Sequence, residues 1–315
     1  MNGIAAMSKT PAPAATAPRR PRARQHPTSR AVDRLQDVHI DPASGLHIGT
    51  IVIGKQLLRV GIRPLPQGTA SSGRPLLLFN GIGANLELAG LLMAQLDSVE
   101  TLIFDLPGAG KSPPPKFPYR LFEMARLAAK LLDELGYAAA FDVMGVSWGG
   151  GLAQQFAIQY PRRVRRLVLA ATAMGAPAML PGHPRVLLKM LNPRRYLDPG
   201  YMKRVAPELY GGDLRSKPEA IKLFTDHARA GSRKGYRYQM LAMLGWTSLP
   251  WLWRIKHPTL VLAGNDDPLV PLVNARVHAW LLPNARLHVF DDGHLFLLTR
   301  ARETAGVIAA FLGEA

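Results

Sequence analysis

The stretch Gly145-Val146-Ser147-Trp148-Gly149-Gly150 decides the fold of this chain. A nearly all-apolar run over 141–144 precedes it, and a helical pattern over 152–160 follows it. The stretch fits G-x-S-x-G, in which a sharp turn between a strand and a helix exposes the serine hydroxyl. Its glycines have no Cβ atom and permit the close packing that such a turn needs. The motif makes Ser147 a candidate nucleophile.

A serine alcohol is a weak nucleophile and needs a base, which in turn needs an acid to orient it. Asp267 lies within the stretch 264–271, and His294 follows an apolar run over 287–290. The chain order serine, aspartate, histidine resembles that of the α/β-hydrolases. We therefore expect His294 to take the proton of Ser147 and Asp267 to hold the imidazole.

Two neighbouring aspartates compete for the role of the acid. Asp266 and Asp267 both follow a predicted strand that ends near Gly264. The spacing G-x-x-D-x-x-x-P selects Asp267, and Pro268 restricts the backbone of that residue to extended conformations. We favour Asp267 and keep Asp266 as the alternative.

The oxyanion formed by serine attack needs two aimed backbone donors. In the fold that the motif indicates, one donor is the residue after the serine and the other lies in the loop after the third strand. These donors are Trp148 and Ile82. Asn80-Gly81-Ile82-Gly83 departs from the more usual His-Gly start of that loop, but its glycines still permit a close backbone approach.

A second glycine-rich stretch, 105–112, begins with an aspartate that invites a catalytic role. We assign Asp105 a turn-stabilising role instead, because aspartate readily accepts hydrogen bonds from backbone amides two residues on. The stretch lacks the G-x-G-x-x-G pattern at the start of a helix that a nucleotide site needs.

Short, nearly all-apolar runs without polar alternation are typical of strands buried on both faces. Helical patterns alternate with them, which predicts an α/β fold with a mostly parallel sheet. Two aliphatic runs, 48–53 and 56–62, flank Gly54-Lys55 and predict an antiparallel hairpin at the N-terminal edge of that sheet. The expected strands are 76–79, 102–104, 141–144, 167–169 and 260–262, and the expected helices are 86–96, 119–135 and 152–160.

The alternation stops after residue 173 and resumes near 258, which predicts a catalytic domain made of 35–173 and 258–315. The intervening residues 174–257 are rich in methionine and tryptophan and predict an inserted helical cap. Most methionine and tryptophan residues serve core packing. An insertion at the carboxyl edge of an α/β sheet, however, overlies the ligand crevice. We expect the cap to line the substrate site.

The chain of 315 residues contains no cysteine, which excludes disulfides, thiolate metal sites and a cysteine nucleophile. No segment approaches the roughly 20 consecutive apolar residues of a membrane span, and the N-terminus lacks the apolar run of a secretory signal. The expected location is the cytoplasm.

The formal net charge is +17, and seven basic residues against one acidic residue lie within 1–34. This arm is rich in proline, alanine and arginine, so we expect it to be disordered. Its charge fits a tether to anionic lipid or nucleic acid. A solubilising tail, a true start at Met7 and an organelle transit peptide are the other interpretations.

Five stretches together resemble the intracellular depolymerases of medium-chain-length polyhydroxyalkanoates, which are α/β-hydrolases. The resemblance runs from about residue 48 to 312. It implies a serine hydrolase that cuts ester bonds of a storage polyester at cytoplasmic granules, with Ser147, Asp267 and His294 as its triad and no metal or organic cofactor. The stretches are 79–85, 145–150, 245–248, 262–271 and 291–300.

Two alternatives stay open beside this interpretation. A general carboxylesterase or lipase would share the same triad, and a non-catalytic granule-associated protein would bind polymer through the apolar cap. Serine at the elbow disfavours polyester synthases, which use cysteine there, and dehalogenases and epoxide hydrolases, which use aspartate.

Overall fold

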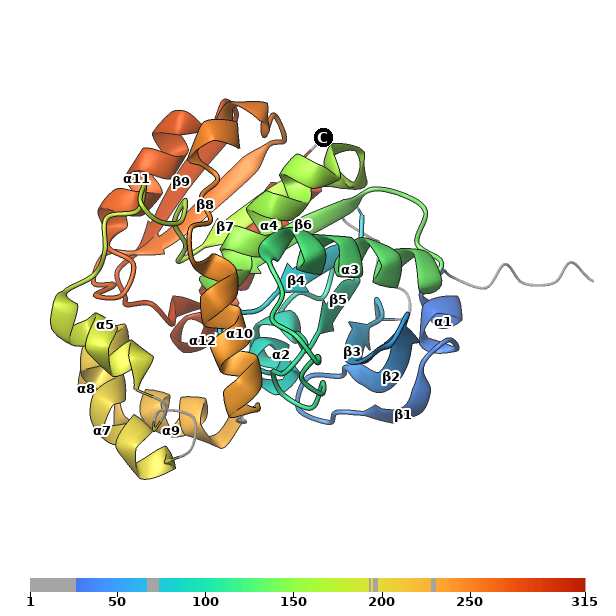
Figure 1. Cartoon of the computed structure of the whole chain (residues 1–315), viewed down its shortest axis with the longest axis horizontal. Coiled ribbons are helices and arrows are strands. Elements are labelled where there is room, and N and C mark those ends of the chain that lie inside the picture. Colours follow the sequence, from blue (N-terminus) through green and yellow to red (C-terminus); the bar gives the residue numbers. More distant parts are fainter. Residues whose placement is uncertain (1–26, 67–73, 193, 195–197, 228–230, 315) are drawn as a thin grey trace, which may run out of the picture.

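The computed structural model describes residues 27–66, 74–192, 194, 198–227 and 231–314 (Figure 1). Its centre is one sheet with the strand order β1-β2-β3-β5-β4-β6-β7-β8-β9. The strands are β1 Gln36–Ile40, β2 His47–Ile53, β3 Gln56–Arg63, β4 Leu76–Phe79, β5 Thr101–Phe104, β6 Phe141–Val146, β7 Val164–Ala170, β8 Thr259–Gly264 and β9 Ala285–Phe290.

The sheet is antiparallel at its N-terminal side and parallel elsewhere. Strands β1, β2 and β3 pair antiparallel with one another, and β3 pairs antiparallel with β5. From β5 to β9 all neighbouring strands are parallel. The predicted fold class and the hairpin are confirmed, and Gly54 turns the hairpin with a φ of 64°. The hairpin does not form the edge, however, because β1 pairs with the outer side of β2.

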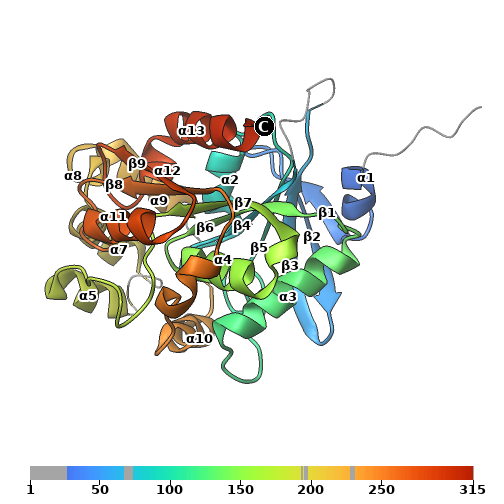
Figure 2. The same ribbon diagram turned by 90° about the horizontal axis from the view of Figure 1, so that it is seen from above.

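Helices cover both faces of the sheet (Figure 2). The helices that follow strands β5, β6 and β8 pack on one face, and two C-terminal helices join the helix after β4 on the other. The first group is α3 Leu121–Glu134, α4 Trp148–Gln159 and α11 Leu272–Leu281; the second is α2 Leu86–Met93, α12 Phe296–Thr299 and α13 Ala301–Gly313. All parallel strands therefore end at one edge, where the loops between strands and helices meet.

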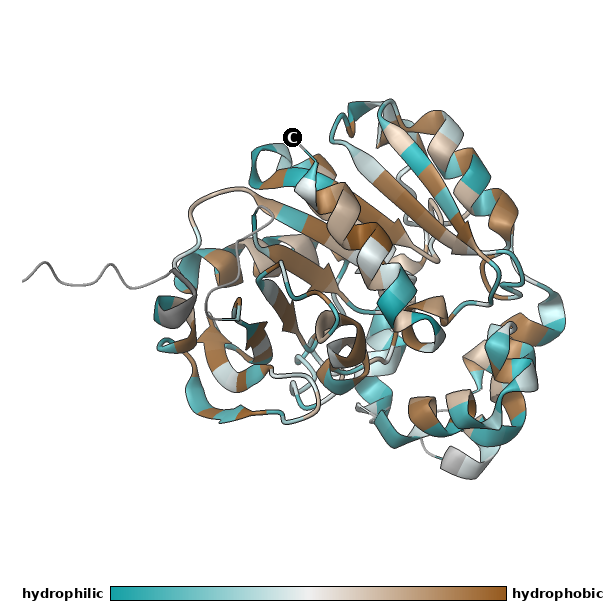
Figure 3. Cartoon of the chain, turned by 180° about the vertical axis from the view of Figure 1, so that it is seen from behind, coloured by the Kyte–Doolittle hydropathy of each residue, from teal (hydrophilic) through white to brown (hydrophobic). Residues whose placement is uncertain are grey.

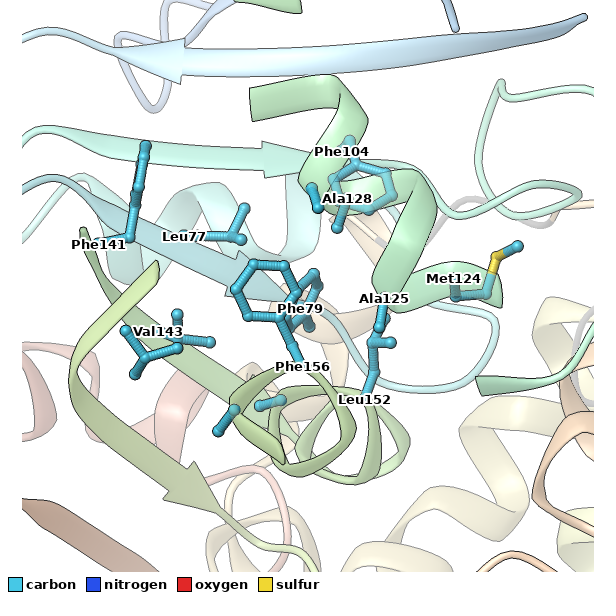
Figure 4. Packing of buried hydrophobic residues seen from close by; sticks show 14 of the residues in the cluster. Leu77, Phe79, Phe104, Met124, Ala125, Ala128, Phe141, Val143, Leu152 and Phe156 are labelled. Atoms are coloured by element: carbon cyan, nitrogen blue, oxygen red, sulfur yellow. The ribbon is translucent and has the colours of Figure 1, made fainter. Parts of the chain in front are cut away.

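Successive side chains of the central strands enter opposite layers, as a strand period of two requires. In β4, Leu77 and Phe79 belong to the core under α3 and α4, whereas Leu76 and Leu78 belong to the core under α2 and α13. Figure 4 shows Phe79 among the side chains of the first core, with its ring 5.8 Å from that of Phe156. Figure 3 shows that the central strands are mainly hydrophobic, whereas most of the surrounding helices carry both hydrophobic and hydrophilic residues. Burial on both faces explains why these strands are all-apolar.

The region predicted as a cap, 174–257, forms helices between β7 and β8 (Figure 1). Four of them share a small apolar core with Leu269 and Leu298 of the catalytic domain, whereas α10 and η2 pack on the main core through residues such as Ala242 and Leu252. These elements are α5 Pro184–Leu191, α7 Pro199–Tyr210, α8 Asp213–Ser216, α9 Pro218–His227, α10 Arg233–Met243 and η2 Leu249–Arg254. The cap thus has an outer lobe and an inner helix that lies on the catalytic domain.

The prediction that disorder extends to residue 34 is wrong. Helix α1 spans Pro27–Val32, and Ala31 and Leu35 are buried in the main core. The Arg34 guanidinium donates a hydrogen bond to the carbonyl of Glu134 at the end of α3. Burial of these two apolar side chains is enough to order this short segment, because the adjacent domain supplies the rest of the core. Most of the arm, 1–26, lies outside the described residues, and so do the interpretations that depend on it.

Within the described ranges, no helix is both long and apolar enough to cross a membrane. In the same residues, no group of three or more His, Cys, Asp or Glu side chains is arranged to hold a metal ion.

A buried polar network ties α4 to α11 and to the cap. The Gln154 amide donates to the carbonyls of Gly150 and Ala173, at 3.0 and 3.2 Å. Its oxygen accepts from Ser248 at 2.6 Å and lies 3.0 Å from Nε2 of His278. Both Gln154 and His278 are fully buried. Burial lowers the pKa of His278 to about 4, although a backbone hydrogen bond at Thr172 favours its charged form.

His278 predicts a pH dependence of stability. Its pKa falls from 6.5 in the unfolded chain to about 4 in the fold, so its contribution is complete above pH 6.5 and is lost as the pH falls toward 4. At about 1.4 kcal/mol per pKa unit, the loss amounts to about 3 kcal/mol. Urea unfolding between pH 6.5 and 4 measures this loss of unfolding free energy in the wild type and in His278→Gln. The variant should lose less stability than the wild type, and an equal loss in both would contradict this account.

Candidate active site

The G-x-S-x-G stretch forms a strained turn between β6 and α4. Ser147 has φ 54° and ψ −117°, in a region that L-residues rarely adopt and that costs of order 1–3 kcal/mol. A Cβ atom on Gly149 would lie 2.1 Å from the carbonyl oxygen of Phe79, and one on Gly150 would lie 2.4 Å from the Thr172 side chain. The helix therefore begins in direct contact with neighbouring strand ends, and Ser147 projects at the carboxyl edge of the sheet.

The structure brings Asp267 and His294 together. Nδ1 of His294 lies 2.6 Å from Oδ2 of Asp267, and both side chains are buried. The other carboxylate oxygen accepts from the amides of Leu269 and Val270, each at 2.9 Å. With Oδ1 held by these amides, Oδ2 is aimed at the imidazole, which fixes the ring orientation.

Asp266 has a different environment. Its carboxylate accepts from the Gly212 amide at 2.7 Å and pairs with the Arg215 guanidinium, and about half of its side chain is exposed. It therefore links the strand end to α8 in the cap, and the His294 imidazole is bonded to Asp267 instead. Of the two neighbours, Asp267 is the one that the structure places against the imidazole.

The two predicted oxyanion donors come from different segments: Trp148 directly follows Ser147, and Ile82 lines the same cavity as Ser147. Trp148 is the first residue of α4, so its backbone N–H has no acceptor four residues back within the helix. Ile82 lies between two engaged amides: Gly81 donates to the Asn80 side chain at 2.9 Å, and Gly83 donates to Gln239 at 2.8 Å. Among the described residues, no acceptor is recorded for the Ile82 amide.

A cavity lies in front of these groups, and Ser147, His294 and Ile82 all line it. Its wall extends from the strand ends between α2 and the outer lobe of the cap, and most of the lining is apolar. The apolar contributors include Leu88, Leu92, Met190, Met202, Phe224, Leu269 and Leu298. The predicted nucleophile and base thus face one hydrophobic space, which the cap helps to enclose.

Asp105 does not line this cavity. Its oxygens accept from the amides of Leu86 and Lys111, at 2.9 and 3.0 Å, and Arg59 lies 3.4 Å away. Burial raises its pKa to about 6, although these hydrogen bonds and Arg59 favour the ionised form. The carboxylate therefore stabilises loop 105–112, as expected, but through the amide of Lys111 and the start of α2 and not through an amide two residues on.

Two residues at the site had no signal in the sequence. The Tyr210 ring from α7 stacks on the His294 imidazole, with centroids 5.9 Å apart, and its carbonyl accepts from the His294 amide at 2.7 Å. The Thr172 hydroxyl donates to the Ser147 carbonyl at 2.7 Å. Both contacts join segments far apart in the chain, so no local pattern could reveal them.

The comparisons with known proteins agree with this geometry. The family model described as the alpha/beta hydrolase fold matches residues 74–301. The chain belongs to the α/β-hydrolase family. The crystal structure of an enol-lactonase from Burkholderia xenovorans LB400 superposes with a TM-score of 0.71 at 23% identity, covering 84% of this chain and all of that one. At this identity the likeness concerns the fold alone.

Relatives with higher sequence identity indicate the type of hydrolase more closely than the shared fold does. The poly(3-hydroxyalkanoate) depolymerase of Ectopseudomonas oleovorans is 51% identical over 267 residues, which cover 84% of this chain and 92% of that protein. The 2-hydroxymuconate semialdehyde hydrolase of Pseudomonas sp. strain CF600 is 30% identical over 286 residues, covering 84% and 95%. The predicted resemblance to polyhydroxyalkanoate depolymerases is confirmed, and the chain is a member of a hydrolase family.

The geometry predicts opposite outcomes for the two aspartates. Asp267→Asn should lower kcat for ester hydrolysis by about 10⁴-fold, because the amide no longer holds the imidazole in the required tautomer. Asp266→Asn is the matched control and should retain activity within a few fold, because this side chain bonds to Gly212 and Arg215 in the cap. Steady-state kinetics on a soluble ester measure both. Loss of activity in Asp266→Asn with retention in Asp267→Asn would reverse the assignment.

Proposed function

We propose that this protein is a serine hydrolase that cleaves ester bonds of intracellular medium-chain-length poly(3-hydroxyalkanoate) through an acyl-enzyme. The observation that carries the proposal is the buried Asp267–His294 pair, which lies at the cavity that Ser147 also lines. This arrangement supplies a nucleophile, a base and an orienting acid in one place. A sequence identity of 51% to a poly(3-hydroxyalkanoate) depolymerase supports the choice of polyester as substrate.

In the proposed mechanism, Ser147 attacks the ester carbonyl while His294 takes its proton, and Asp267 stabilises the imidazolium. The backbone amides of Ile82 and Trp148 bind the developing oxyanion. The hydroxyl end of the polymer leaves with a proton from His294. Water then enters, loses a proton to His294 and hydrolyses the acyl-enzyme, which releases a hydroxy acid and restores the serine. None of these steps uses a metal or an organic cofactor.

The apolar lining of the cavity supports a substrate with alkyl side chains. Its lining between α2 and the cap consists mainly of leucine, methionine and phenylalanine side chains, such as Leu88, Met202 and Phe224. Each methylene removed from water is worth about 0.8 kcal/mol. An alkyl branch that enters this space would therefore bind more tightly as it lengthens, as long as the cavity accommodates it.

The polymer is water-insoluble, so we place the enzyme at the surface of polyhydroxyalkanoate granules in the cytoplasm. The cap, 174–257, supplies part of the cavity wall and would lie between polymer and catalytic groups. A carboxylesterase acting on small soluble esters would use the same groups. The two functions differ in whether polymer in granules is degraded.

A substrate series tests this proposal. Purified wild type and Ser147→Ala are offered granules of medium-chain and short-chain polyester and soluble esters of increasing acyl length, and release of hydroxy acid is measured. The wild type should degrade the medium-chain polymer, and Ser147→Ala should lose about 10⁶ in turnover. Hydrolysis of soluble esters without polymer would indicate a general carboxylesterase. Granule binding without any hydroxy acid would indicate a coat protein, and activity in Ser147→Ala would refute the mechanism.

A further inference from the structure

The two proposed oxyanion donors belong to segments that follow different strands. Ile82 lies in the loop after β4, and Trp148 begins α4 after β6. Stabilisation of an oxyanion depends on fixed donor positions, because donors that must reorient during the reaction lose most of their effect. A group that holds both segments at once would therefore act on the reaction without touching the substrate.

We propose that Gln239, in the cap helix α10, is a positioning residue for both donors; this inference rests on the proposed function. Its side-chain Oε1 accepts a hydrogen bond from the Gly83 amide at 2.8 Å. Its backbone carbonyl accepts one from Nε1 of the Trp148 indole, also at 2.8 Å. Gln239 is fully buried, so water does not compete for either bond.

The hydrogen bond from Gly83 to Gln239 occupies one amide of the loop and leaves the neighbouring Ile82 amide available to bind an oxyanion. Gly81 donates to Asn80, and Gly83 donates to Gln239, so the amides on both sides of Ile82 are engaged. Gly83 has a φ of 69°, a conformation that turns the chain sharply after Ile82. Fixing the amide after Ile82 restrains the peptide that follows the donor, just as Asn80 restrains the one before it.

Helix α10 is itself held firmly enough to serve as this support. Near its start, the Ser232 amide donates to the Gly108 carbonyl at 3.0 Å, and a Cβ atom on Gly235 would lie 2.3 Å from Cα of Gly108. Near its end, Met243 lies against Gly151 of α4. The helix thus joins the catalytic domain on both sides of Gln239, and the cap completes the oxyanion hole through this residue.

The test compares Gln239→Met with the matched control Gln155→Met. Methionine keeps the length of the side chain and deletes the amide. Gln155 also joins the cap to the catalytic domain, because its Oε1 accepts from Trp246 Nε1 at 2.9 Å. It lies on α4 seven residues after Trp148, away from both proposed donors. The measurements are the melting temperature, kcat and KM on a soluble ester, and affinity for an alkylboronic acid, whose serine adduct has an oxyanion.

Gln239→Met should lower kcat by about 10- to 100-fold, less than complete loss of one oxyanion donor. Affinity for the boronic acid should fall by a similar factor, whereas KM should stay nearly constant, since ground-state binding is unaffected. Gln155→Met should lower the melting temperature to a similar extent and leave kcat nearly unchanged. A second variant, Trp148→Phe, removes the other bond to Gln239 and should lower kcat by a smaller factor.

The inference is overturned if Gln239→Met keeps both kcat and boronic acid affinity, or if Gln155→Met lowers kcat as much. If Gln239→Met does not fold, the Trp148→Phe variant provides the test. Unchanged kcat and boronic acid affinity in Trp148→Phe would then overturn the inference. A wild type without esterase activity would instead refute the proposed function, so the two failures are distinguishable.

Discussion

The direct contact between the start of α4 and the ends of the neighbouring strands is the constraint on which the site depends. Gly149 and Gly150 let this backbone approach the carbonyl of Phe79 and the side chain of Thr172. The approach forces the left-handed φ of Ser147 and exposes its hydroxyl at the sheet edge. It also places Trp148 at the first position of α4, directly after Ser147. One packing contact thus positions both the proposed nucleophile and one of the proposed oxyanion donors.

Around this turn, the catalytic domain and the cap contribute different functions. The parallel strands bring Asp267 and His294 to the edge where Ser147 lies, because each follows the carboxyl end of its strand. The cap supplies Tyr210 against the imidazole, apolar side chains along the cavity and Gln239 beside the oxyanion loop. The outer lobe therefore lines the cavity, and in our proposal α10 supports the oxyanion donors.

Much of this arrangement is predictable from sequence, because its determinants are local. All-apolar runs predicted the buried strands, and the glycines around Ser147 predicted a turn that tolerates no side chain there. The spacing to Pro271 distinguished Asp267 from Asp266. The strand β1 and helix α1 were missed, since short polar segments such as 36–40 depend on a neighbour already in place. Gln239 and Tyr210 could not be predicted, because their roles come from contacts across more than 80 residues of chain.

A crystal structure of the protein after reaction with an alkylphosphonate ester tests the central claim most directly, because the adduct resembles the tetrahedral intermediate. The account predicts phosphorus on Oγ of Ser147 and one phosphoryl oxygen about 2.7–3.1 Å from the amide nitrogens of both Ile82 and Trp148. The His294 imidazole should lie within hydrogen-bond distance of the adduct and remain bonded to Asp267. A phosphonate on another residue, or an adduct on Ser147 with neither amide engaged, would contradict the account.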